Sequence, residues 1–69
     1  MVKYKFLIPV HTDLTTFDSG SVWKLEEVIA KDGGYTAYIF RLDDNGKEIG
    51  SMWGVPLLIL HCCCEKIIE

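Results

Sequence analysis

The feature that most restricts the fold is a short polar turn between two apolar runs in the second half of the chain. Residues 35–42 (YTAYIFRL) place aromatic and β-branched side chains on both faces of an extended chain. Residues 43–46 are Asp-Asp-Asn-Gly, and asparagine and glycine tolerate the positive φ that tight hairpin turns require. Residues 47–55 are again rich in apolar side chains. The pattern predicts a β-hairpin of two strands joined by this turn.

The first third of the chain predicts a further strand and a loop. Residues 2–8 alternate aromatic or branched side chains with lysines and end before Pro9, a pattern typical of a strand. Residues 11–21 are polar and rich in turn-forming residues, and we expect an ordered loop anchored by Leu14 and Phe17. Gly50 and Gly54, within the strand that follows the hairpin turn, indicate a sharp bend or a close approach of another backbone.

Two segments are compatible with either a helix or a strand. Residues 22–32 have apolar side chains at helical spacing, but they also suit a strand that pairs with residues 35–42 through a glycine turn. Residues 56–68 fit a final strand, or a helix with Pro56 at its first position. We favour the strand in both segments.

These patterns predict one small domain, residues 1–69, of the mainly β class. We expect a small antiparallel meander or a partly open barrel of about five strands. The alternative is an α+β fold, in which helices at residues 22–32, 57–68 or both pack on a three-stranded antiparallel sheet. A chain of 69 residues buries a small core, so we expect it to form a homo-oligomer or to need a partner.

Charge and cysteine content exclude several classes of partner. Seven Lys and Arg against ten Asp and Glu give a net charge of -3, which disfavours binding to nucleic acid. The longest apolar stretch, residues 55–64, is interrupted by His61 and is about half as long as a membrane-spanning helix. Three adjacent cysteines make a poor disulfide framework and indicate a reducing compartment. With no recognisable signal peptide at the start, we expect a cytoplasmic protein without a membrane partner.

Two groups of side chains could carry chemistry. Residues 61–64 (His-Cys-Cys-Cys) are of metal-binding types, but neighbours on a strand face opposite sides, and two ligands do not complete a tetrahedral site. We expect these cysteines to pack as small hydrophobic residues. His11 and Asp13 lie near several hydroxyl groups but lack the third partner of a catalytic triad. We therefore predict no catalytic residue, no metal and no cofactor.

By elimination, we predict a non-enzymatic, small acidic interaction protein that binds a larger intracellular protein and could inhibit it. In size and charge the chain resembles the compact inhibitors encoded by phages and mobile elements, a likeness that no motif carries. Aromatic residues are the usual anchors of interfaces, and acidic residues attract basic partners. The candidate contacts are Trp23, Asp43, Asp44 and Trp53.

The alternative function is a small-ligand-binding oligomer with pockets between its subunits. Such pockets combine apolar walls with a few converging polar groups, which His11, Asp13 and Tyr35 could supply. A hydrolytic protein using His11, or a metal-binding protein using residues 61–64, is a third and less favoured hypothesis.

Overall fold

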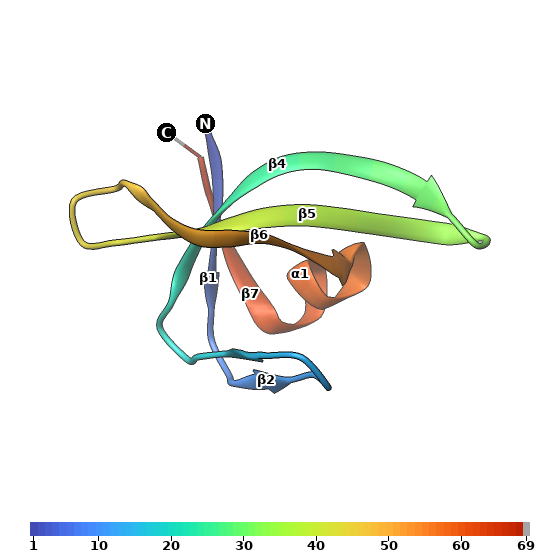
Figure 1. Ribbon diagram of the computed structural model, residues 1–69, viewed down its shortest axis with the longest axis horizontal. Helices are drawn as coiled ribbons and strands as arrows, with labels where there is room; N and C mark the ends of the chain where they lie inside the picture. Colours follow the sequence, from blue (N-terminus) through green and yellow to red (C-terminus); the bar gives the residue numbers. More distant parts are fainter. Residues whose placement is uncertain (69) are drawn as a thin grey trace.

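The computed structural model describes residues 1–68 and contains a five-stranded antiparallel sheet, a two-stranded sheet and one short helix (Figure 1). The order of strands in the large sheet is β6-β5-β4-β1-β7, and the small sheet pairs β2 with β3. The mainly β class is confirmed, as an open sheet that does not close into a barrel. The elements are β1 (Val2–Phe6), β2 (Val10–His11), β3 (Thr16–Phe17), β4 (Val22–Lys31), β5 (Gly34–Leu42), β6 (Glu48–Pro56), α1 (Leu57–Cys63) and β7 (Cys64–Ile68).

The predicted hairpin is formed by β5 and β6, and β6 lies at one edge of the large sheet. The Asp43 amide donates a hydrogen bond to the Lys47 carbonyl (2.8 Å), and the Gly46 amide donates to the Asp43 carbonyl (3.0 Å). Gly46 has a φ of +81°, which its lack of a Cβ allows. The turn expected at residues 43–46 is present, and Gly46 supplies its positive φ, whereas Asn45 does not have a positive φ.

Residues 22–31 form strand β4, so the helix alternative for this segment is wrong. Asp32 and Gly33 both have positive φ, of 51° and 81°, and they reverse the chain so that Lys31 pairs with Gly34. From that turn the pairing runs back to Val22 and Leu42. The register shifts once, between Leu25 and Glu27, and the pairing continues beyond it. The turn and this long pairing with β5 outweigh the helix propensity of the segment.

The C-terminal segment is neither a single strand nor a single helix. Pro56 lies at the N-cap position, helix α1 follows it, and Cys64 returns to extended geometry (φ -126°, ψ 155°) to begin β7. Since β6 and β7 lie at opposite edges of the sheet, the chain must cross between the edges, and α1 makes that crossing (Figure 1). Across residues 1–68, no helix has both the length and the apolar character needed to cross a membrane.

The core is centred on three aromatic rings from different parts of the chain. Phe6 and Phe17 stack with ring centroids 5.1 Å apart, and Trp23 meets Phe17 edge-on at 4.9 Å. Trp23 Nε1 donates a hydrogen bond to Ser21 Oγ (2.8 Å). The indole N–H therefore has a partner, although the rest of the cluster is apolar. Phe17 thus fastens the small β2–β3 sheet to the large sheet.

The glycines of β6 have different structural roles. Gly50, with a φ of +74°, lies in a β-bulge, where residues 39–41 of β5 are opposite residues 49–53 of β6. Gly54 is opposite Tyr38, and a Cβ added to Gly54 would lie only 3.0 Å from Tyr38 Cε1. The bend and the close approach expected from these glycines are both present, although a side-chain ring, and not a backbone, approaches Gly54.

Candidate functional site

Trp23, one of the predicted partner contacts, is a core residue. Its side chain is 3% exposed and is enclosed by Phe6 and Phe17. A buried ring offers no surface to another protein unless the domain opens, so the prediction of Trp23 as a surface contact is wrong. Strand β4 presents its tryptophan to the covered face of the sheet.

The structure separates the predicted acidic contacts from Trp53. Asp43 and Asp44 line a depression of about 590 Å³ that also contains Lys3 and Arg41. The Asp43 carboxylate accepts hydrogen bonds from the Asn45 and Lys47 amides, both at 2.9 Å, and so stabilises its own turn. Trp53 lines a different depression. The four predicted contacts therefore do not form one surface.

Several of the acidic side chains are paired with bases. Lys24 forms ion pairs with Glu48 and with Glu26 (3.3 Å) and lies over the Phe40 ring, 5.7 Å from its centroid. The hydrogen bond with Glu48 raises the pKa of the Lys24 ammonium above its usual value. Arg41 Nη1 lies 3.3 Å from Asp18 Oδ2. In these pairs, bases stand next to Glu26, Glu48 and Asp18, so these three acids are not unpaired negative charges on the surface.

The loop between β2 and β3 holds a leucine in solvent, contrary to the expectation that Leu14 anchors this loop. Leu14 is 82% exposed, whereas Phe17 is 1% exposed and supplies the anchor. Thr12 Oγ1 accepts hydrogen bonds from the Leu14 amide (3.3 Å) and the Thr15 amide (3.0 Å). The hydroxyl and the amide of Thr12 both donate to the Thr15 carbonyl, at 2.8 and 2.9 Å. We call residues 12–15 the Leu14 turn.

A depression of about 450 Å³ lies beside this turn. Trp53, which is half-buried on β6, and Gly54 form one wall, and Phe17 contributes the base of the loop. The depression is lined by Thr12, Asp13, Leu14, Phe17, Trp53 and Gly54. It brings together two residues that the sequence predicted for different roles, Trp53 as a partner contact and Asp13 as a ligand contact.

The predicted small-ligand set is divided between two places on the chain. His11 lies on β2, where its Nδ1 is 3.2 Å from Thr16 Oγ1, and Asp13 lines the depression beside Leu14. Tyr35 lies at the start of β5 and lines a groove with residues of α1. None of the described hollows is lined by all three residues.

The three cysteines differ in their surroundings. Cys62 is exposed on α1, which corrects the expectation that it packs in the core, while Cys63 and Cys64 are half-buried. Burial, with a smaller contribution from the neighbouring Cys63, raises the pKa of the Cys64 thiol to about 11. A thiol that holds its proton is a poor metal ligand and a poor nucleophile. Within residues 1–68, no group of three or more His, Cys, Asp or Glu side chains is arranged to hold a metal ion.

Sequence reasoning missed Leu14 as a surface residue. The available signal was the spacing of Thr12 and Thr15 on either side of Asp13 and Leu14. A threonine hydroxyl can hold such a short turn closed by hydrogen bonds to the backbone. Comparisons of the chain with protein families, with curated proteins and with solved structures give no significant match.

Proposed function

We propose that this chain is a non-enzymatic protein-binding module, and that it contacts a larger protein through the Leu14 turn and the depression beside it. The observation that carries the proposal is the combination at Leu14 of 82% exposure with a turn closed by four hydrogen bonds. An isolated exposed leucine on a surface is ordinary. A leucine held outward by a hydrogen-bonded turn, beside a half-buried tryptophan, is a pre-organised anchor.

The energetics of binding favour such an anchor. Burying an exposed leucine side chain contributes about 1.5–3 kcal/mol, none of which Leu14 gives to its own fold. Because the turn is already ordered, binding loses little conformational entropy there. Trp53 offers an aromatic wall for an apolar group of the partner.

Charge defines the partner further. Asp13 is the acidic residue of the depression, and the chain has a net charge of -3. A partner with an apolar pocket for Leu14 and a basic group near Asp13 fits this surface, and the net charge would accelerate its approach.

The test compares three immobilised proteins in an extract of the source organism: the natural chain, Leu14→Ser and Ile68→Ser. Ile68 is 73% exposed on β7, so Ile68→Ser makes the same kind of change away from the Leu14 turn. The proposal predicts a protein that is retained by the natural chain and by Ile68→Ser but lost on Leu14→Ser.

A titration with the purified partner then gives the magnitude. Leu14→Ser should raise the dissociation constant by about 30-fold or more, as loss of a central interface anchor does, and Asp13→Asn should weaken its dependence on salt. Retention of the same proteins by all three chains would refute the proposed surface. So would a purified partner whose affinity is unchanged by Leu14→Ser.

A further inference from the structure

Asn45 carries the only side-chain amide of the chain, because the sequence contains one asparagine and no glutamine. It lies in the turn between β5 and β6 and is followed by Gly46. Asparagine is a thermolabile residue, and it reacts fastest when glycine follows, because glycine has no Cβ to shield its own backbone nitrogen. The sequence therefore places this amide beside the residue that most favours its loss.

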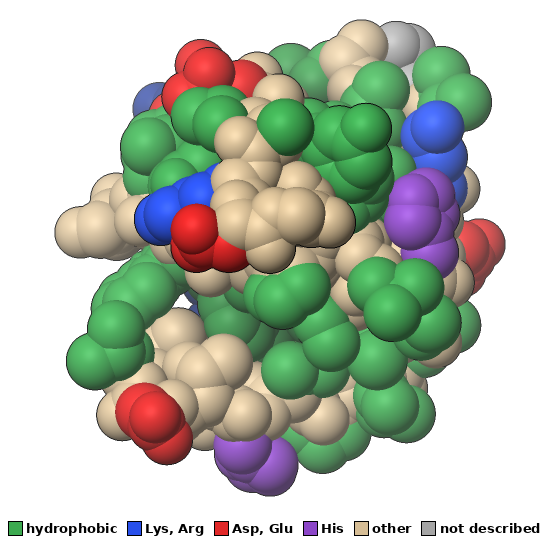
Figure 2. Space-filling model, turned by 90° about the vertical axis from the view of Figure 1, so that its right-hand side faces the viewer, with side chains coloured by type: hydrophobic (Ala, Val, Ile, Leu, Met, Phe, Trp, Pro, Cys, Tyr) green, Lys and Arg blue, Asp and Glu red, His purple; other side chains and the backbone are tan. Residues whose placement is uncertain are grey.

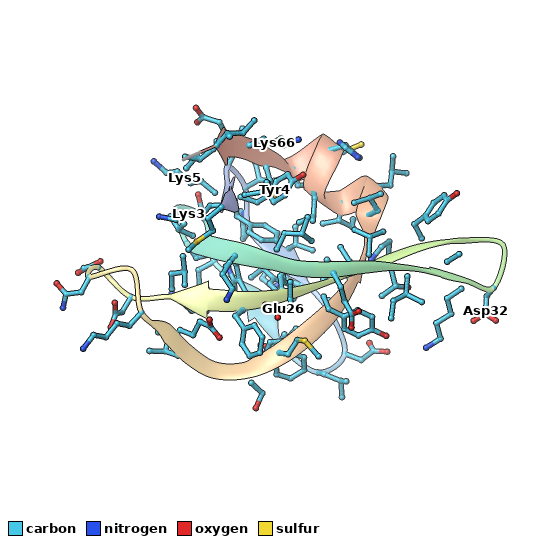
Figure 3. The ribbon with its side chains drawn as sticks, turned by 90° about the horizontal axis from the view of Figure 1, so that it is seen from above. Lys3, Tyr4, Lys5, Glu26, Asp32 and Lys66 are labelled. Carbon is cyan, nitrogen blue, oxygen red and sulfur yellow. The ribbon has the colours of Figure 1, made fainter. Side chains whose placement is uncertain are left out.

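The turn that contains Asn45 is open to water. Residues 44–47 are all exposed, and a Cβ added to Gly46 would meet nothing within 4 Å among residues 1–68. The turn lies at the opposite end of the molecule from Asp32, at the tip of the β4–β5 hairpin (Figures 1 and 3). Figure 2 shows hydrophobic side chains over much of the side on which the β4–β5 hairpin ends. The β5–β6 turn at the other end is polar, so water reaches Asn45 freely.

Hydrogen bonds of the turn hold back the backbone nitrogen that would react. The Gly46 amide donates to the Asp43 carbonyl (3.0 Å), so the Gly46 nitrogen is engaged while the turn is closed. The Asp43 carboxylate accepts hydrogen bonds from the Asn45 and Lys47 amides, both at 2.9 Å, and so stabilises the closed turn. Reaction at Asn45 therefore requires a local opening, and these hydrogen bonds set how often the turn opens.

We infer that Asn45 is a site of spontaneous deamidation and that Asp43 restrains its rate. When the turn opens, the Gly46 nitrogen loses its proton to water and attacks the side-chain carbonyl carbon, Asn45 Cγ. An N–Cγ bond forms, the Cγ–Nδ2 bond breaks, and Nδ2 takes a proton from water and leaves as ammonia. The resulting five-membered succinimide ring then adds one water molecule. Ring opening at the side-chain carbonyl gives aspartate, and opening at the main-chain carbonyl gives isoaspartate, in which the backbone runs through Cβ and Cγ.

Both products alter the domain. A neutral amide becomes a carboxylate, so the net charge changes from -3 to -4. Isoaspartate also adds one atom to the backbone of a turn that fixes the start of the β5–β6 pairing at Leu42 and Glu48. The reaction involves no residue that lines the depression beside Leu14, so the inference stands independently of the proposed function.

The test follows the intact mass of the full natural chain over several weeks at about 37 °C and about pH 8. Each event exchanges ammonia for water and so raises the mass by about 1 Da, and Asn45 is the only side-chain amide that can supply it. The tryptic peptide of residues 42–47, sequenced by electron-transfer fragmentation, should contain both aspartate and isoaspartate at position 45. Asn45→Ser has no side-chain amide and should keep its mass.

Two variants test the restraint that Asp43 imposes. Asp43→Ala removes the carboxylate that accepts two hydrogen bonds and should speed the mass gain by about tenfold or more. Asp44→Ala is the matched control, because it removes the same charge from a neighbour that makes neither bond, and its rate should stay close to that of the natural chain. Circular dichroism checks that both variants fold. The natural chain in urea gives a second measurement without a substitution, and it should react faster than the folded chain.

Three outcomes would overturn the inference. The first is a folded natural chain whose mass does not change. The second is a product that contains aspartate alone, which would exclude the succinimide ring. The third is the same rate in Asp43→Ala as in the natural chain, which would show that the Asp43 carboxylate does not restrain the reaction.

Discussion

Replacing Phe17 with leucine tests whether the aromatic cluster fastens the small sheet to the large one. Phe17 is 1% exposed and makes two ring contacts, a stack on Phe6 at 5.1 Å and an edge contact with Trp23 at 4.9 Å. Each such aromatic pair contributes about 0.5–1.5 kcal/mol beyond the area that it buries. Leucine keeps most of the apolar burial and loses both pairs, so the free energy of unfolding should fall by about 1–3 kcal/mol.

This loss is large for so small a domain. A chain of 69 residues has a total stability of roughly 3–10 kcal/mol, and a loss of about 2 kcal/mol should lower Tm by roughly 8–16 °C. Urea unfolding followed by circular dichroism measures the change, with Leu14→Ala as the control that should stay within about 0.5 kcal/mol of the natural chain. If Phe17→Leu lowers the free energy of unfolding no more than Leu14→Ala does, the ring contacts of Phe17 do not fasten the small sheet to the large one.

Three further predictions concern the backbone and the titratable groups. Gly50→Ala should lower the free energy of unfolding by about 1–2 kcal/mol because Gly50 has a φ of +74°. A synthetic chain with D-alanine at position 50 should keep its stability. Equal losses for the L-alanine and D-alanine chains would exclude backbone strain as the cause. The pKa of the Cys64 thiol is about 11 in the folded chain, against 9.0 for an ordinary thiol. The free energy of unfolding should therefore fall as the pH rises from 9 to 11. This fall should be smaller in the Cys64→Ala variant. The hydrogen bond with Glu48 raises the pKa of Lys24 above 10.5, so the stability that this pair adds at neutral pH should persist up to pH 10.5 and be lost above it as Lys24 deprotonates. A Glu48→Gln variant with an unchanged alkaline pH profile would contradict this.

The parts of the fold that could be predicted are those governed by local chemistry. Residues 43–46 form a turn because Gly46 accepts a positive φ, and that turn sets the register of β5 and β6 as far as the pair Arg41 and Ile49. Residues 32–34 act in the same way for β4 and β5. In both places a few neighbouring residues contain the information.

Helix α1 depends on contacts that are distant along the chain. The apolar run at residues 57–63 has no periodicity long enough to distinguish a helix from a strand. In the folded chain this run connects β6 and β7, which lie at opposite edges of the sheet. The final strand was expected, but the crossing before it could be recognised only once the order of all five strands was known.

The candidate site was harder to predict, because exposure depends on which face of the sheet is covered. Trp23 and Trp53 are the same residue type in similar strands, yet Trp23 is buried in the core and Trp53 lines a surface depression. Leu14 was expected to be buried because it is apolar, but hydrogen bonds to Thr12 hold its turn outward. Sequence patterns identify candidate residues, but which of them reach solvent depends on which face of the sheet each side chain lies on.

The rigidity of the Leu14 turn is the most direct test of the account, because the proposed binding surface depends on a leucine held in place before any partner arrives. Amide order parameters from ¹⁵N relaxation of the free chain measure it on the nanosecond timescale. A pre-organised turn should give values above about 0.8 for residues 12–16, similar to those of β4 and β5 in the body of the sheet. Values below about 0.6 across these residues would show a flexible loop and would contradict the claim that Leu14 is a pre-organised anchor.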